Sequence, residues 1–233
     1  MSQLDMVTIS RDTAKRIVKD VSDIIKNPLD NEGIFYKHDT ENMLLGYAII
    51  FGPDHGLYAK GLYCFEFTYP YDYPYTPPKV RYCTNDGRTR FHPNLYRGGK
   101  VCLSILNTWR GESWSSCQSI RSILLNLLML FNDKPILNEP GVTSTHKDYA
   151  NYHDIIRFKN IQHSICYQLN TKRPKSFFIF FDSIIKDYYK KHTESIIETI
   201  NLFKKQYPNK KLLKTELYEM KSLIDYESIQ FHY

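Results

Sequence analysis

Apolar side chains recur at helical spacing soon after the chain begins. The repeat consists of Ala14, Ile17, Val18, Val21, Ile24 and Ile25. Such spacing places one apolar stripe along a helix. Ser10 is a suitable N-cap, and Asp12 puts negative charge in the first turn, where the helix dipole favours it. We therefore predict a helix that starts near Ser10 and ends at Asn27-Pro28.

The pattern then changes to the alternation of strands. Alternate apolar residues run from Leu45 to Phe51 and stop at the Gly52-Pro53 turn. A second run, from Leu62 to Tyr69, puts four aromatic side chains on one face. Lys79–Cys83 alternates over a shorter stretch. Short connections between such runs predict an antiparallel meander of three or four strands, with the first helix packed on its aromatic face.

Helical periodicity returns in the second half of the chain. Ile120–Phe131 carries a broad apolar stripe, which we interpret as core. Three further helices are predicted over Tyr149–Leu169, Ser176–Gln206 and Lys214–Leu223, separated by breaks at Thr171–Pro174 and Tyr207–Asn209. The predicted fold class is α+β, with a core domain over residues 8–170 and a helical extension over 171–233. The aromatic stripe of the extension (Phe177, Phe181, Tyr188) must pack on the core, because large apolar patches are rare on soluble surfaces.

Composition narrows the functional classes. No apolar run approaches the about 20 residues that span a bilayer, and the first residues lack a secretory pattern. The five cysteines have neither paired nor zinc-ligand spacing. We therefore expect an intracellular protein, cytoplasmic or nuclear, with reduced thiols, no metal and no membrane association. Residues 147–233 hold 15 Lys/Arg against 10 Asp/Glu. We interpret this excess as a solvated lysine-rich surface, and nucleic acid is not an expected partner.

One cysteine lies in a context that favours chemistry. The irregular stretch Thr84–Ser116 is long, and loops of this length are uncommon unless they are functional. Within it, Gly98-Gly99 lets the chain turn back, so that Cys102 faces the loop that bears Asn94. A thiolate can carry an acyl group, and a side-chain amide can donate to the oxyanion formed when an amine attacks that group. Cys102 and Asn94 are therefore the candidate reactive residues of this loop.

The stretch from His92 to Leu106 resembles the active-site segment of ubiquitin-conjugating enzymes. Three more motifs carry the resemblance: Tyr73-Pro74-Tyr75-Thr76-Pro77-Pro78-Lys79-Val80, Trp114-Ser115 and Asn138-Glu139-Pro140-Gly141. The insertion Thr108–Gly111 and the helical extension look most like the large, C-terminally extended class-Z subgroup. The resemblance implies the ubiquitin-conjugating fold. It also implies that ubiquitin is accepted from an activating enzyme as a thioester and passed to lysine amines of target proteins, usually with a ligase. No cofactor is implied, since the activating enzyme consumes the ATP.

The resemblance also implies roles for residues around Cys102. Asn94 stabilises the oxyanion or braces the loop, and the two roles are compatible. Glu139 is the carboxylate that orients the acceptor lysine, and Tyr96 lines the lysine channel. His92 and Pro93 are structural. Ser104 stands where many ubiquitin carriers have aspartate.

Two partner surfaces follow from the same resemblance. Lys15, Arg16 and Lys19 match the basic stripe that meets the activating enzyme. Tyr75 matches the exposed aromatic side chain that ligases contact. Its loop partner is Ser115-Ser116-Cys117, where the family usually has Ser-Pro-Ala. We expect the helical extension to dock beyond the loop that carries Glu139 and to shape access for acceptors.

Two alternatives remain open. The first is a carrier of another modifier, such as the small ubiquitin-like modifier, whose conjugating enzyme shares the Cys-Leu-Ser-Ile-Leu run. The second is a non-catalytic binding module of the same fold, although such variants lack the cysteine. Incubation with activating enzyme, ATP and each modifier, followed by a search for a reductant-sensitive adduct, separates them.

Overall fold

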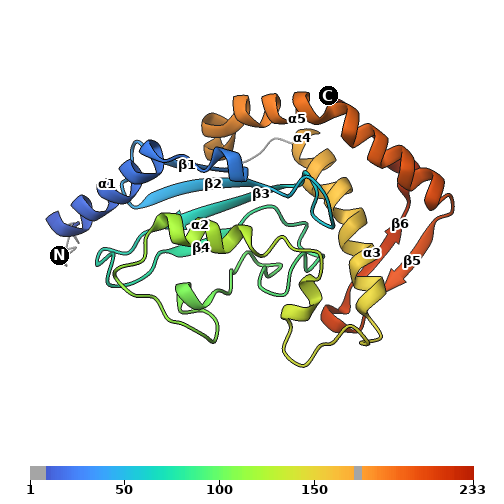
Figure 1. Ribbon diagram of the computed structural model, residues 1–233, viewed down its shortest axis with the longest axis horizontal. Coiled ribbons are helices and arrows are strands. Elements are labelled where there is room, and N and C mark those ends of the chain that lie inside the picture. Colours follow the sequence, from blue (N-terminus) through green and yellow to red (C-terminus); the bar gives the residue numbers. More distant parts are fainter. Residues whose placement is uncertain (1–8, 171–174) are drawn as a thin grey trace, which may run out of the picture.

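The computed structural model describes residues 9–170 and 175–233. A four-stranded sheet lies between two helical layers, with α5 on one side and α2 on the other (Figure 1). Helix α1 lies at one end of the sheet and α3 at the other, and a two-stranded hairpin extends beyond α3. The α+β class predicted from the sequence is confirmed.

Helix α1 spans Arg11–Lys26, and its N-terminus is capped as the sequence predicts. The Ser10 hydroxyl accepts from the Thr13 backbone N–H at 3.0 Å. The buried positions recur on one side of the helix, with Ile17 and Ile24 in the core. Local spacing and capping chemistry therefore suffice to define this helix.

The sheet is an antiparallel meander in the order β1-β2-β3-β4. Its strands are β1 (Ile34–His38), β2 (Leu45–Phe51), β3 (Leu62–Thr68) and β4 (Lys79–Tyr82). Alternation locates the last three strands in the sequence, whereas it does not locate β1.

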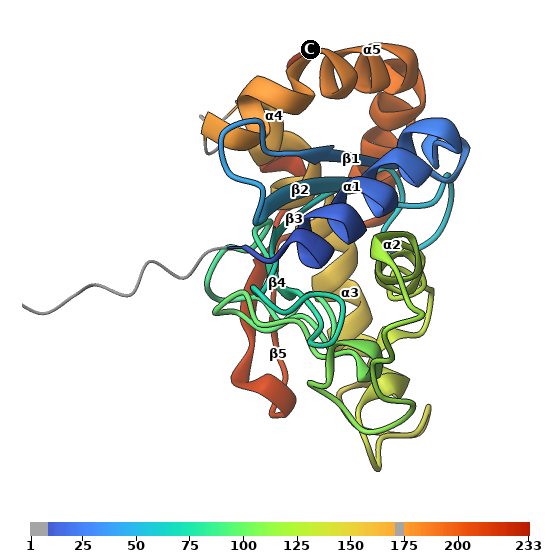
Figure 2. The same ribbon diagram turned by 90° about the vertical axis from the view of Figure 1, so that its left-hand side faces the viewer.

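The aromatic face of β3 packs mainly against the segment around α2 (Ile120–Leu128). The Tyr63 ring stacks on Phe131, just beyond that helix, with centroids 4.0 Å apart. Helix α1 packs beside α2 at the end of the sheet instead of covering the aromatic face (Figures 1 and 2). The expected position of α1 is therefore corrected: the segment of α2, whose apolar stripe is buried, contacts this face instead.

Helix α5 (Lys175–Gln206) covers the opposite face of the sheet. Phe177 packs edge-on against Tyr47 of β2 with centroids 5.6 Å apart, and Tyr188 stacks on Phe51 at 3.6 Å. These contacts bury the aromatic stripe on the core. Helix α5 docks on the sheet. The expectation that the helices of the extension dock beyond the loop that carries Glu139 is therefore wrong for α5. The segment that follows α5 occupies that position.

The predicted helix Tyr149–Leu169 is helical throughout but changes its winding. It consists of α3 (Tyr149–Lys159), a π-helical segment η4 (Asn160–Tyr167) and α4 (Gln168–Asn170). The expected break at residues 171–174 lies outside the described residues. Short 3-10 helices complete the list: η1 (Asp30–Glu32), η2 (Ser104–Leu106), η3 (Pro135–Asn138), η5 (Leu217–Glu219) and η6 (Tyr226–Ser228).

The helix predicted over Lys214–Leu223 is wrong, because this stretch lies in a hairpin. Its strands are β5 (Lys211–Lys214) and β6 (Lys221–Ile224), joined by η5. Alternate residues point inward in β6, with Ser222 and Ile224 buried. A run of only four residues fits either periodicity, and packing against α3 decides the outcome.

No helix within residues 9–170 and 175–233 is both long enough and apolar enough to cross a membrane.

Docking of α5 predicts a measurable loss of stability when its buried side chains are shortened. Phe181 is 0% exposed and Ile179, two residues earlier, is 72% exposed. Phe181→Ala should lower the free energy of unfolding by about 3–5 kcal/mol, because it leaves a cavity. Ile179→Ala should change it by less than about 0.5 kcal/mol. Urea unfolding measures both, and equal losses would contradict the docking of α5.

Candidate active site

The candidate site forms where the His-Pro-Asn turn meets the segment of Cys102. The Cys102 N–H donates to the Asn94 carbonyl at 2.9 Å, and the Asn94 side-chain amide donates to the Cys102 carbonyl at 2.6 Å. Gly99 makes the reversal with a φ of 91°, and a Cβ there would lie 2.9 Å from the Tyr82 carbonyl oxygen. The structure therefore brings Asn94 and Cys102 together, as the spacing of the motif predicts.

The bond between the Asn94 amide and Cys102 is the bracing interaction expected for this residue. A side-chain amide carries two N–H donors, of which this bond uses one. Stabilisation of an oxyanion on an acyl group at Sγ is thus chemically compatible with bracing.

His92 is 0% exposed and holds the turn through both ring nitrogens. Nδ1 accepts from the Asn94 backbone N–H at 3.0 Å, so the ring proton belongs on Nε2. Nε2 lies 2.8 Å from the Asn138 side-chain amide and donates to it when the amide is turned so that its oxygen faces the ring. Burial and the nearby Arg90 guanidinium lower the pKa of His92 to about 3. A neutral ring with both nitrogens engaged suits a structural role better than proton transfer.

Arg90 is a member of the site for which the sequence carries no signal. Its guanidinium donates to the Pro93 carbonyl at 2.6 Å and to the His92 carbonyl at 3.3 Å. It also lies 3.3 Å from the centroid of the Tyr96 ring. Pro93 is buried and Tyr96 half-buried. Arg90 therefore joins the turn to the tyrosine expected at the lysine channel.

Glu139 follows η3 and is half-buried. Because its neighbour Asn138 contacts His92, the carboxylate is tied to the turn that carries Asn94. The Tyr218 hydroxyl donates to Oε2 of Glu139 at 2.6 Å. Tyr218 lies in the hairpin that the sequence misassigned as helix, so sequence analysis could not place it at the site.

Cys102 is 1% exposed, so its thiol is enclosed. Thr108 of the insertion packs along both neighbours of the cysteine: its hydroxyl accepts from the Leu103 N–H at 3.0 Å and donates to the Val101 carbonyl at 2.9 Å. Formation of a thioester therefore requires the surroundings of the thiol to shift. Burial raises the pKa of both Cys83 and Cys166 to about 11, so little of either thiol is ionised at neutral pH.

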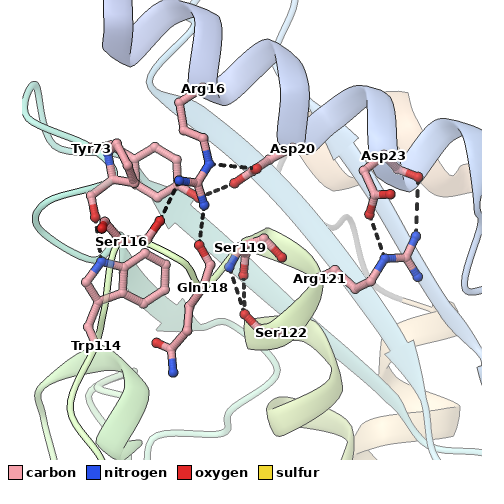
Figure 3. Close-up of polar contacts among 11 residues, drawn as sticks. Arg16, Asp20, Asp23, Tyr73, Trp114, Ser116, Gln118, Ser119, Arg121 and Ser122 are labelled. Carbon is pink, nitrogen blue, oxygen red and sulfur yellow. Dashed lines mark hydrogen bonds and ion pairs between the residues drawn. The ribbon is translucent and has the colours of Figure 1, made fainter.

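Arg16, from the group expected to meet the activating enzyme, contacts Ser116, from the group expected to meet a ligase (Figure 3). Lys15 and Lys19 are exposed, but Arg16 is half-buried. The Arg16 guanidinium forms an ion pair with Asp20 at 2.9 Å and donates to the Ser116 carbonyl at 2.6 Å. Arg16 therefore braces the loop instead of standing free for a partner.

The ligase-side loops are also fixed to each other. Tyr75 is 78% exposed, whereas the Trp114 indole N–H donates to the Pro74 carbonyl at 2.7 Å. Ser115 and Ser116 are exposed beside it. Tyr75 and the two serines are thus exposed on loops that this hydrogen bond joins.

A family model described as ubiquitin-conjugating enzyme matches residues 16–163. The chain therefore belongs to the ubiquitin-conjugating enzyme family. It is 39% identical to ubiquitin-conjugating enzyme E2 Z of Homo sapiens over 180 residues, which cover 72% of this chain and 50% of that protein. It is 38% identical to the Xenopus tropicalis protein of the same name over 188 residues, covering 74% and 59% of the two chains. The expected resemblance to the class-Z subgroup is confirmed.

A probable ubiquitin-conjugating enzyme of Acanthamoeba polyphaga mimivirus is 33% identical over 196 residues, covering 78% of this chain and 13% of that protein. The chain spans about half the length of the human relative.

The buried His92 predicts acid destabilisation. Its pKa of about 3 lies below the ordinary 6.5, so the unfolded chain binds a proton that the folded chain excludes. The free energy of unfolding should fall on acidification below about pH 6.5, by at most about 1.4 kcal/mol per pH unit from this group. His92→Asn keeps a hydrogen-bond acceptor and should flatten this slope, measured by urea unfolding between pH 7.5 and 5.

The exposed His55 provides the matched control. Other buried histidines contribute equally to the pH slope of the unaltered protein and of both variants. Only the difference in slope between these proteins is therefore interpreted. A slope changed as much by His55→Asn as by His92→Asn would contradict the assignment.

Proposed function

We propose that the chain accepts ubiquitin from an activating enzyme as a thioester on Cys102 and transfers it to lysine amines of target proteins, usually with a ligase. The observation that carries this proposal is the reciprocal bonding of Asn94 and Cys102 within a turn held by a neutral, buried His92. A thiol held beside a fixed amide donor is the arrangement that acyl transfer requires.

Two substitutions at one carbonyl carbon make up the reaction. In the first, the Cys102 thiolate attacks the thioester of the charged activating enzyme, and that enzyme's thiol leaves. In the second, a neutral lysine amine attacks the new thioester, the amine loses its proton, and Cys102 leaves as thiolate. Asn94 donates to the oxyanion in the second step, while Glu139 and Tyr96 orient the amine.

The partner surfaces in this proposal differ in one respect from the sequence expectation. Lys15 and Lys19 contact the activating enzyme directly, while Arg16 supports them indirectly by bracing the loop that follows Trp114. Tyr75, Ser115 and Ser116 form the ligase surface. Residues 8–170 form the conjugating core, and residues 171–233 form an extension docked on it. Five free thiols suit a reducing compartment, the cytoplasm or nucleus.

The first test concerns the attachment point. Cys102→Ala should abolish the reductant-sensitive adduct, and Cys102→Ser should form an adduct that resists reductant, because an oxygen ester replaces the thioester. Cys117 is exposed, so Cys117→Ser is the control and should charge normally. Charging is measured by gel shift with activating enzyme, ATP and ubiquitin or another modifier. Attachment at any other cysteine would refute the proposal.

The second test separates the two steps. Asn94→Ala should leave charging nearly intact, because no lysine amine is involved in that step. Discharge to free lysine should slow by about 10²-fold, the usual cost of a lost oxyanion donor. Single-turnover discharge of the purified thioester measures the rate. Equal losses in both steps would show that Asn94 only holds the loop.

A further inference from the structure

The β5–β6 hairpin descends from the far end of α5, and its tip reaches the loop that carries Glu139 (Figure 1). Several polar contacts anchor it to the core. The Leu217 N–H donates to Oδ2 of Asp148 at 2.7 Å, and the Asn151 amide donates to the Lys214 carbonyl at 3.0 Å. The Arg90 backbone N–H lies 3.3 Å from the Met220 sulfur. The extension therefore contacts the segment that leads into the His-Pro-Asn turn.

Tyr218 occupies the tip in an unfavourable backbone conformation. Its φ of 62° is left-handed, which a residue with a Cβ rarely adopts. Such conformations persist only where surrounding contacts hold them, and they cluster at functional sites. Here the Tyr218 carbonyl accepts from the Arg97 guanidinium, and Arg90 lies 5.1 Å from the centroid of the Tyr218 ring.

The hydroxyl of Tyr218 contacts Glu139, the carboxylate expected beside the acceptor amine. It donates to Oε2 of Glu139 at 2.6 Å, a short hydrogen bond to a charged acceptor. A bond to one carboxylate oxygen fixes the plane of the group and hence the direction of the other oxygen. Burial and the adjacent Glu139 raise the pKa of Tyr218, so the phenol keeps its proton and remains a donor at neutral pH.

We propose that Tyr218 is a positioning residue for the acceptor amine, which orients the Glu139 carboxylate toward the thioester on Cys102. This inference rests on the proposed function. Arg90 completes the arrangement, because one guanidinium bonds the carbonyl of Pro93 and packs on the rings of both Tyr96 and Tyr218. The extension thus supplies the Tyr218 hydroxyl, which orients the carboxylate beside the acceptor amine, whereas the nucleophile, Cys102, belongs to the core.

The test is Tyr218→Phe in the full chain, which removes only the hydroxyl. Charging of Cys102 should be unchanged, whereas discharge to free lysine should slow about tenfold, because the carboxylate loses its fixed direction. Discharge to hydroxylamine should keep its rate, since that nucleophile is uncharged at neutral pH and needs no carboxylate to orient an ammonium group. Single-turnover rates at several lysine concentrations supply the measurement.

Two further variants assign the effect to Glu139. Tyr218→Phe combined with Glu139→Gln should be no slower than Glu139→Gln alone, because Tyr218 acts through that carboxylate. Tyr189→Phe is the matched control: this extension hydroxyl also bonds the core, donating to the Lys60 carbonyl at 3.1 Å on another side of the molecule. It should leave discharge unaltered. Thermal unfolding of each variant shows that the fold is retained.

Several outcomes would overturn the inference. Discharge to lysine that is unchanged or faster in Tyr218→Phe would exclude a positioning role, as would equal slowing toward hydroxylamine or in Tyr189→Phe. A normal rate of discharge to lysine in Glu139→Gln would show that the carboxylate has no part in the reaction. It would leave the proposed thioester function intact. Failure of the unaltered chain to form a thioester with any modifier would overturn the proposed function and this inference together.

Discussion

The segment that leads to Cys102 is buried without a sheet ladder or helix of its own, and this constraint governs the site. Buried backbone carbonyls need hydrogen-bond donors. The Tyr58 hydroxyl donates to the Phe91 carbonyl at 2.5 Å, and the Tyr152 hydroxyl donates to the Arg90 carbonyl at 3.0 Å. Arg90 and His92 then satisfy the groups of the turn itself. Side chains from the sheet connection and from α3 therefore add to the hydrogen bonds that the loop makes within itself.

The extension and the core are joined both by apolar burial and by hydrogen bonds to buried backbone carbonyls. Helix α5 covers the face of the sheet opposite α2, so β2 is buried on both sides. The Tyr189 hydroxyl donates to the Lys60 carbonyl, in the connection that leads to β3. Beyond α5, the hairpin returns to the Arg90 and Glu139 segments. The extension thus stabilises the scaffold through apolar burial and reaches the site through a few polar contacts.

The features that the sequence predicted correctly depend on interactions between residues close together in the chain. Ser10 caps the first helix three residues from its partner, and the Gly98-Gly99 reversal brings Asn94 to Cys102 within one motif. The polar partners that join distant segments were not predictable. Tyr218 meets Glu139 across 79 residues, and nothing local in either segment indicates that contact. The hairpin was misassigned for the same reason, because its strands are defined by α3 and by each other rather than by their own periodicity.

Arg16 has a different role from the one that its motif predicts, because of a contact with a distant part of the chain. The sequence groups it with Lys15 and Lys19 as one basic stripe, yet its side chain bonds Asp20 and the Ser116 carbonyl (Figure 3). Asp20 in turn accepts from the Tyr73 hydroxyl. Helix α1, the Tyr75 loop and the serine loop are therefore joined through the ion pair of half-buried Arg16 and buried Asp20. Loss of Arg16 would leave the buried charge of Asp20 uncompensated, so this pair couples the stability of the helix to that of both loops. The exposed Lys15, Lys19 and Tyr75 thus lie on segments that one network of polar contacts connects.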